Sequence, residues 1–262
     1  MIDRGWWGVA VAAAIATLAG RAGSLSVSGQ AAAVVVGALA VRAGWGWGAV
    51  LVLYFVLATA LSRWGRAEKA RRTRDVTPHG GRRSAVQVVA NGGVFAGLLS
   101  VGDHPALRLA ALGALAAAAA DTWATEVGTR VGGTPRHLLT GAPLPPGLSG
   151  GVTVAGTLAA LAGATVTALA APWLIPSAGR GGIITIAAAG FLGALLDSVL
   201  GATRQGRWRC PTCGTIGERA RHCDTFTEHA AGWRWMTNDL VNLAATAGGA
   251  LLAFGFPSLR FI

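Results

Sequence analysis

The chain has 262 residues, of which 53% are hydrophobic and only 13% are charged. An ordinary soluble domain is roughly 25% charged, so this composition excludes a soluble fold for most of the chain and predicts an integral membrane protein. The formal net charge of +11 does not indicate a nucleic-acid-binding protein, because the basic residues lie between apolar segments. We therefore expect membrane lipid, and no nucleic acid, as a partner.

Apolar segments of about 20 residues, the length needed to cross a bilayer, recur along the chain. They predict an all-α fold, a polytopic transmembrane helical bundle of about eight spans within a single domain over 1–262. The predicted spans lie near 5–22, 27–43, 46–62, 84–101, 105–122, 150–172, 182–200 and 239–256. The first could instead be a cleaved signal peptide, but its apolar stretch leads straight into Arg21 and a short linker, which favours a membrane helix.

Basic residues predict the orientation of this bundle. The loop over 62–83 contains eight of them, and placing it in the cytoplasm puts 17 of the 22 lysines and arginines on that side. Cytoplasmic loops of membrane proteins carry such an excess. We therefore expect a protein of the cell (inner) membrane with cytoplasmic polar loops and both termini external.

Four acidic residues, Asp121, Glu126, Asp197 and Asp239, lie at or near the cytoplasmic ends of predicted spans. An ionisable group at membrane depth is costly and is usually functional or paired. Asp121 and Glu126 lie five residues apart in Ala-Asp-Thr-Trp-Ala-Thr-Glu-Val-Gly, near one face of a helix. Carboxylates suit Mg²⁺, which prefers oxygen ligands. The simpler alternative is a capping aspartate beside a solvated glutamate.

The segment before the sixth predicted span has features of a phosphate-binding loop. It contains Arg136 and then Pro-Pro-Gly-Leu-Ser-Gly-Gly-Val-Thr over 145–153. Gly147, Ser149 and Gly150 could direct backbone N–H groups at an anion next to a helix N-terminus, with Arg136 supplying charge. The alternative is an ordinary Gly-Ser turn.

Other polar residues at the ends of predicted spans complete the expected phosphate-binding set. They are Arg82, Arg83, Gln87, Asn91, Ser198, Arg204, Asn238 and Asn242. Each has a structural alternative. An Asp197–Arg204 salt bridge, a helix cap at Asn238, amides that hold helices together and topology-determining arginines would explain them without a ligand.

The predicted cytoplasmic loop over 204–237 contains all three cysteines. Cys210-Pro-Thr-Cys213-Gly forms a Cys-x-x-Cys turn, and His222-Cys223 follows. This spacing predicts a structural zinc site in which Cys223 is the third ligand and His222 or His229 the fourth. The alternatives are a redox dithiol and a knuckle that binds no metal.

Over about residues 30–256 the chain resembles the integral membrane family that contains plant phytyl-phosphate kinase and animal transmembrane protein nineteen. The resemblance depends on Ala-Asp-Thr-Trp-Ala-Thr-Glu-Val-Gly, Gly-Leu-Ser-Gly-Gly-Val-Thr, Leu-Asp-Ser-Val-Leu-Gly-Ala and Asn-Asp-Leu-Val-Asn in combination. More remotely, the chain is similar to CTP-dependent polyprenol kinases and cytidylyltransferases. The resemblance implies phosphoryl transfer from a nucleoside triphosphate, with CTP favoured, to an isoprenoid monophosphate such as phytyl or geranylgeranyl phosphate.

Such a reaction needs metal ions, positive charge and positioning. We expect Asp121 and Asp197, together with Glu126 and Asp239, to hold Mg²⁺ on the triphosphate. Two alternatives remain. A cytidylyltransferase would use the same groups but release pyrophosphate, and a small-anion transporter would show two repeated halves, which the sequence does not display.

The implied reaction also gives roles to the arginine side chains. Arg136 and the 147–151 loop would bind phosphate oxygens of the nucleotide, while Arg82, Arg83 or Arg204 would receive the prenyl phosphate.

Overall fold

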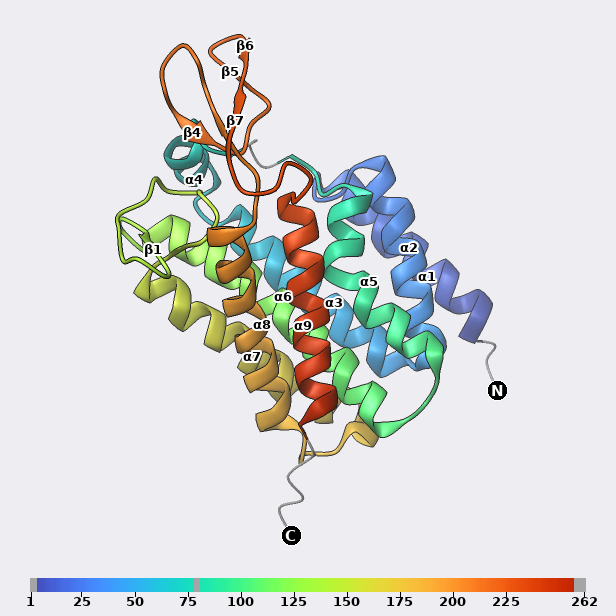
Figure 1. Cartoon of the computed structure of the whole chain (residues 1–262). Coiled ribbons are helices and arrows are strands. Elements are labelled where there is room, and N and C mark those ends of the chain that lie inside the picture. Colours follow the sequence, from blue (N-terminus) through green and yellow to red (C-terminus); the bar gives the residue numbers. More distant parts are fainter. Residues whose placement is uncertain (1–3, 78–80, 257–262) are drawn as a thin grey trace.

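The structure is a computed structural model that describes residues 4–77 and 81–256, most of which are helical (Figure 1). Each predicted span overlaps one long helix. The helices are α1 Arg4–Arg21, α2 Val27–Ala43, α3 Trp45–Arg63, α4 Arg66–Thr73, α5 Ala85–Val101, α6 Pro105–Val131, α7 Val154–Leu174, α8 Ile183–Thr203 and α9 Asn238–Gly255, with a 3₁₀ turn η1 at Pro176–Ala178.

Three of these helices, α3, α7 and α8, are long and apolar enough to cross a membrane. The apolar helices α2 and α5 have 17 residues each, a rise of about 26 Å against a hydrocarbon core of about 30 Å. The total of about eight spans stays a prediction.

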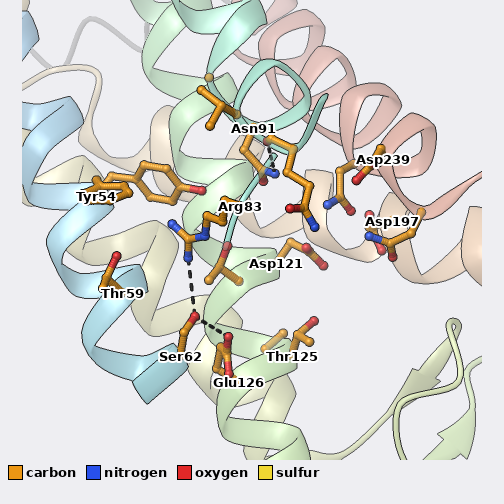
Figure 2. Close-up of a pocket in the computed structure, with 18 of the residues that line it drawn as sticks. Tyr54, Thr59, Ser62, Arg83, Asn91, Asp121, Thr125, Glu126, Asp197 and Asp239 are labelled. Carbon is orange, nitrogen blue, oxygen red and sulfur yellow. Dashed lines mark hydrogen bonds between the residues drawn. The ribbon is translucent and has the colours of Figure 1, made fainter. Parts of the chain in front are cut away.

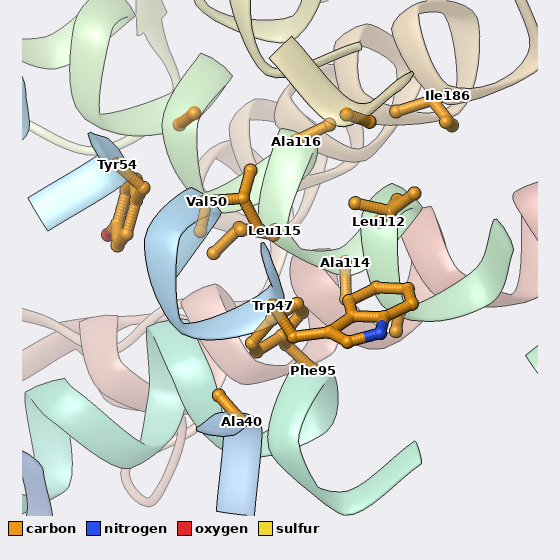
Figure 3. Close-up of a cluster of buried hydrophobic side chains, with 14 of the residues drawn as sticks. Ala40, Trp47, Val50, Tyr54, Phe95, Leu112, Ala114, Leu115, Ala116 and Ile186 are labelled. Carbon is orange, nitrogen blue, oxygen red and sulfur yellow. The ribbon is translucent and has the colours of Figure 1, made fainter. Parts of the chain in front are cut away.

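Helix α6 lies at the centre of the bundle and contacts α3, α5, α7, α8 and α9. Its residues from Ala110 to Ala120 are all buried. Small side chains allow close approach, since a Cβ added to Gly113 would lie 2.5 Å from the Gly249 carbonyl oxygen of α9. Larger side chains, including Trp47, Phe95 and Leu115, fill the space between α3, α5 and α6 (Figure 3).

The structure corrects the predicted end of the fifth span. Helix α6 continues to Val131, nine residues beyond the expected limit, so that Asp121 and Glu126 both lie inside it. The polar segment stays helical because it packs against α7, where Gly128 and Gly156 are in close contact. At 3.6 residues per turn, the two carboxylates point about 140° apart rather than along one face.

The segments between the helices are not all irregular, so short strands are added to the mostly helical fold that the sequence predicted. The predicted loop over 62–83 contains α4, and the two segments after α6 and α8 contain short strands. These are β1 Arg136–His137, β2 Gly151–Val152, β3 Arg207–Arg209, β4 Ile216–Gly217, β5 Arg221–His222, β6 Thr225–Phe226 and β7 Glu228–Ala231. Strands β1 and β2 pair with each other, β4, β3 and β7 form an antiparallel sheet in that order, and β5 and β6 form a hairpin.

Figure 1 shows α4, β1 and the β4–β7 strands at one end of the bundle and the last turn of α9 at the other. At that opposite end the first turn of α3 meets the end of α7, since a Cβ on Gly46 would lie 1.9 Å from the Leu174 carbonyl oxygen. Arg108 Nη1 also donates to the Ser177 carbonyl at 3.4 Å there. The arginine-rich loops therefore share one end of the molecule.

Candidate active site

A cavity of about 1440 Å³ runs from the arginine-rich end into the bundle. One part is apolar and is lined by α1, α2 and α3, with side chains such as Ile15, Val41 and Val52. The other part is polar and is lined by the ends of α6, α8 and α9, by the 147–151 loop and by residues of the 205–220 segment. The cavity can therefore accept a molecule with an apolar chain and a charged head.

Three helices bring carboxylates to the polar part. Figure 2 shows Asp121 of α6, Asp197 of α8 and Asp239 of α9 on one side of the cavity. Within the described chain, the buried Oδ2 of Asp197 has no hydrogen-bond partner. Asp121 and a further carboxylate, Glu218, line the same cavity as Asp197. Clustered carboxylates with an unsatisfied oxygen are suited to a divalent cation.

Glu218 and Gln205 are cavity residues that the sequence reasoning missed. Glu218 Oε1 accepts a hydrogen bond from the Ser149 N–H at 3.0 Å. Burial raises the pKa of Glu218, although hydrogen bonds from Ser149 and the charge of Arg207 oppose the increase. The Gln205 side chain is 3% exposed, and its buried Oε1 finds no partner among the residues described. No local sequence pattern marks either residue. Both reach the cavity only because the 204–237 segment folds back onto the end of the bundle.

Glu126 has other partners than the aspartates. Its carboxylate forms an ion pair with the buried Lys69 of α4 and accepts a hydrogen bond from Ser62 Oγ at 2.5 Å. Arg83 Nη2 donates to the same Ser62 hydroxyl at 3.4 Å (Figure 2). Glu126 is therefore engaged by Lys69 and Ser62, and the metal-binding role that the sequence predicted for it is not retained. Its contacts connect α6 with α4 and α3 and, through Ser62, with Arg83.

Arg83 is held by its backbone, which runs beside the linker between α1 and α2. Its N–H donates to the Ser24 carbonyl at 3.0 Å, and its carbonyl accepts from the Ser26 N–H at 3.0 Å. A Cβ on Gly29 would lie 2.0 Å from that same carbonyl oxygen, so α2 approaches closely only because residue 29 is glycine. The guanidinium lies 5.6 Å from the Phe55 ring centre, where the apolar and polar parts of the cavity meet.

The 147–151 loop, for which the sequence predicted phosphate binding, lines the cavity, but it is held differently from a simple anion loop. Gly150 has a φ of +83°, and a Cβ there would lie 2.4 Å from the Ala202 backbone at the end of α8. Thr153 caps α7 by accepting from the Gly156 N–H at 3.0 Å, and Ser149 donates its N–H to Glu218. These two N–H groups are thus satisfied within the protein.

Three predicted phosphate-binding arginines lie away from the cavity. Arg82 is exposed, Arg136 donates to the Gly141 carbonyl at 2.9 Å, and Arg204 stacks over Trp233 at 4.8 Å. None lines the described cavity, because the β1–β2 turn and the 204–237 segment direct Arg136 and Arg204 outward. In the described residues Arg204 forms no salt bridge with Asp197, so that alternative is wrong as well.

The remaining predicted residues do line the cavity: Gln87, Asn91, Gly147, Ser149, Gly150, Ser198, Asn238 and Asn242. Three of their side chains also form structural hydrogen bonds, one of them the bond from Asn91 Nδ2 to the Gln87 carbonyl at 2.9 Å. Gln87 forms a capping box with Ser84 at the start of α5, and Ser198 Oγ donates to the Ala194 carbonyl of its own helix at 3.3 Å.

The cysteines form a second cluster at the tip of the 204–237 segment. One ligand atom from each of Cys210, Cys213, His222 and Cys223 lies within 4.8 Å of the others. Burial alone would raise the pKa of Cys210, but hydrogen bonds from the Cys213 N–H and His222 lower it to about 6. A hydrogen bond with Cys213 raises the pKa of Cys223 to about 11. His229, the other ligand considered, instead packs edge-on against Trp208 at 5.4 Å.

Comparison with known families decides the classification of this helical membrane protein. The family described as "Integral membrane protein DUF92" matches residues 10–250. The chain belongs to the DUF92 family. Membership confirms the prediction of an integral membrane protein from a recognisable family.

Two relatives of this DUF92 member align over most of the chain. Protein PGR of Arabidopsis thaliana is 32% identical over 211 residues, which cover 70% of this chain and 72% of that protein. An uncharacterised membrane protein of Synechocystis is 29% identical over 221 residues, 82% of this chain and 75% of its own length. A third, an uncharacterised membrane protein of Methanocaldococcus jannaschii, is 32% identical over 156 residues, 58% of this chain and 63% of that protein. No solved structure matches.

Proposed function

We propose that this protein is a membrane phosphotransferase that transfers the terminal phosphoryl group of a nucleoside triphosphate, with CTP favoured, to an isoprenoid monophosphate. The observation that supports this most is the two-part cavity, in which an apolar wall from α1–α3 continues into a polar region with carboxylates from three helices. A phosphorylated prenyl chain has the same division into an apolar tail and a charged head.

In the proposed reaction an oxygen of the prenyl phosphate attacks the terminal phosphorus of the nucleotide. The bond to the bridging oxygen breaks, and a prenyl diphosphate and a nucleoside diphosphate leave. Bound Mg²⁺ would neutralise the charge that develops on the transferred group. Asp121, Asp197 and Asp239 would hold it, since the partnerless Asp197 Oδ2 provides the oxygen ligand that Mg²⁺ prefers.

Arg83 is our candidate for binding the acceptor phosphate. It lies where the apolar and polar parts of the cavity meet, and its backbone and Ser62 fix its position. Guanidinium groups bind phosphate oxygens through charge-assisted hydrogen bonds. The amides Asn91, Asn238 and Asn242 surround the same region and are placed to orient the two phosphate groups.

The direct test uses purified protein in detergent with Mg²⁺, labelled CTP or ATP, and a panel of prenyl monophosphates. We expect a prenyl diphosphate and a nucleoside diphosphate as products. Pyrophosphate and a CDP-linked lipid would instead identify a cytidylyltransferase. Nucleotide and prenyl phosphate binding without any product would contradict both forms of the proposal.

We also propose that the arginine-rich end faces the cytoplasm, because short cytoplasmic loops carry the excess of lysine and arginine. The polar loops share this end, while α9, the last described helix, ends at the other (Figure 1). When the full chain is expressed in a bacterium with alkaline phosphatase fused to its C-terminus, the phosphatase should be active. Green fluorescent protein fused at the same place should not fluoresce. The reverse result would place the cavity mouth outside the cell.

A further inference from the structure

We propose that Cys210, Cys213, His222 and Cys223 bind one Zn²⁺ ion, that Asp75 orients the histidine ligand from the outer side, and that this ion holds the β3–β7 unit as a cap on the cavity. The metal site is independent of the proposed activity. Only the importance of the cap for catalysis rests on that activity.

The distances within the cluster suit a tetrahedral zinc site. His222 Nδ1 lies 3.3 Å from Cys213 Sγ and 3.3 Å from Cys223 Sγ. Bonds of about 2.3 Å from zinc to sulfur and about 2.0 Å to nitrogen put such atoms roughly 3.5 Å apart. Cys210 is buried beneath the other two cysteines, which are exposed. Three thiolates and one imidazole are a common structural ligand set for zinc.

The backbone adopts a costly conformation where it places two ligands side by side. Cys223 and Asp224 have positive φ values of 49° and 57°, which residues other than glycine rarely adopt. This turn allows the adjacent His222 and Cys223 to face one point. Backbone strain of this kind persists only where the surrounding structure enforces it, and it is concentrated at functional sites.

The second nitrogen of His222 lies near Asp75, on the segment that follows α4. His222 Nε2 lies 3.7 Å from Asp75 Oδ1, which is also 3.5 Å from Arg74 Nε. Histidine ligands of zinc usually direct their free ring N–H at a carboxylate or carbonyl, which fixes the tautomer and the ring orientation. Asp75 is thus a positioning residue, supplied from more than 130 positions earlier in the sequence.

The same unit is attached to the cavity wall. The Glu218 N–H donates to the Val76 carbonyl at 2.8 Å, and Arg219 Nε donates to the Thr77 carbonyl at 3.1 Å. A Cβ on Gly217 would lie 2.6 Å from the Val76 oxygen, so this contact is close-packed. The zinc ion would therefore fix the strand that delivers Glu218 to the polar part of the cavity.

The test measures metal content and backbone exchange, neither of which depends on enzymatic activity. Full-length protein purified in detergent under reducing conditions should contain one zinc per chain. Co²⁺ exchanged into the site should give the thiolate charge-transfer and visible bands of a tetrahedral centre. Removing zinc with a chelator should speed hydrogen exchange in 207–231 and in the 147–151 loop, while α7 and α8 stay protected.

Variants separate the parts of the proposal. Cys213→Ser, at an exposed ligand, should lose the metal, whereas His104→Asn, at the cap of α6, should retain it. Asp75→Asn should weaken zinc affinity about tenfold, and Glu228→Gln, at an exposed acidic residue of β7, should leave it unchanged. Three reduced thiols without bound metal, or a Cys210–Cys213 disulfide in the native protein, would overturn the site. Unchanged exchange after zinc removal would overturn its role as a cap.

Discussion

Asp197→Asn should lower kcat/KM for Mg²⁺-dependent phosphoryl transfer by about 10²–10³-fold, the range seen when one charge-stabilising group is removed from an active site. The loss should be catalytic rather than structural. In the described part of the protein Asp197 has no ion pair, and its Oδ2 has no hydrogen-bond partner, so asparagine of the same shape removes only the charge. We expect the thermal unfolding temperature to stay the same or rise. Enzyme kinetics and fluorescence-detected unfolding would measure both effects.

The matched control for that variant is Asp103→Asn. Asp103 is an exposed carboxylate at the opposite end of the bundle, where it pairs with Arg108. The control should keep full activity and lose little stability, since exposed ion pairs contribute about 0–1 kcal/mol. If Asp197→Asn retained wild-type turnover at low Mg²⁺, Asp197 would not hold the metal.

Lys69→Met should destabilise the protein by about 3 kcal/mol, because it leaves the Glu126 carboxylate without its cation in a largely buried position. The side chains of Lys69 and Glu126 are 9% and 21% exposed. Lys69 also donates to the Leu61 and Ser62 carbonyls at the end of α3, at 2.8 and 3.1 Å. The measurement is thermal or denaturant unfolding in detergent.

The double variant Lys69→Met with Glu126→Gln distinguishes the buried charge from the lost hydrogen bonds. Removing both charges should recover about half of the stability lost in Lys69→Met, with the rest due to the two α3 carbonyls. A double variant as unstable as the sum of the two single changes would show that the ion pair itself is not the source of the effect.

The positions of the long helices could be predicted from sequence because each depends on a continuous apolar run. The end of α6 could not, since its last turns are polar and stay helical through packing at Gly128 and Gly156. The β3–β7 unit could not be predicted either. Its strands have two to four residues, too few for an alternating pattern, and the segment folds through the cysteine turn and contacts with 75–77.

The candidate site was predictable where a polar residue interrupts an apolar helix, as at Asp121, Asp197 and Asn242. Which of the loop arginines belong to the site was not predictable. Arg83 and Arg136 have the same chemistry in sequence, yet only Arg83 lines the cavity. The difference depends on contacts between segments distant in sequence, Arg83 with the Ser24–Ser26 linker and Arg136 with its own β1–β2 turn.

The close approach of Gly29 to Arg83 affects how natural variants of this protein should be interpreted. Gly29 does not line the cavity, and a sequence change there would be classed as a defect of membrane insertion or helix packing. A Cβ added at residue 29 would nevertheless meet the backbone carbonyl oxygen of Arg83. Arg83 is the residue that we assign to binding the acceptor phosphate. An inherited Gly29→Ala change would thus present as weak substrate binding in a correctly inserted protein, with its cause at a residue that lies outside the cavity lining.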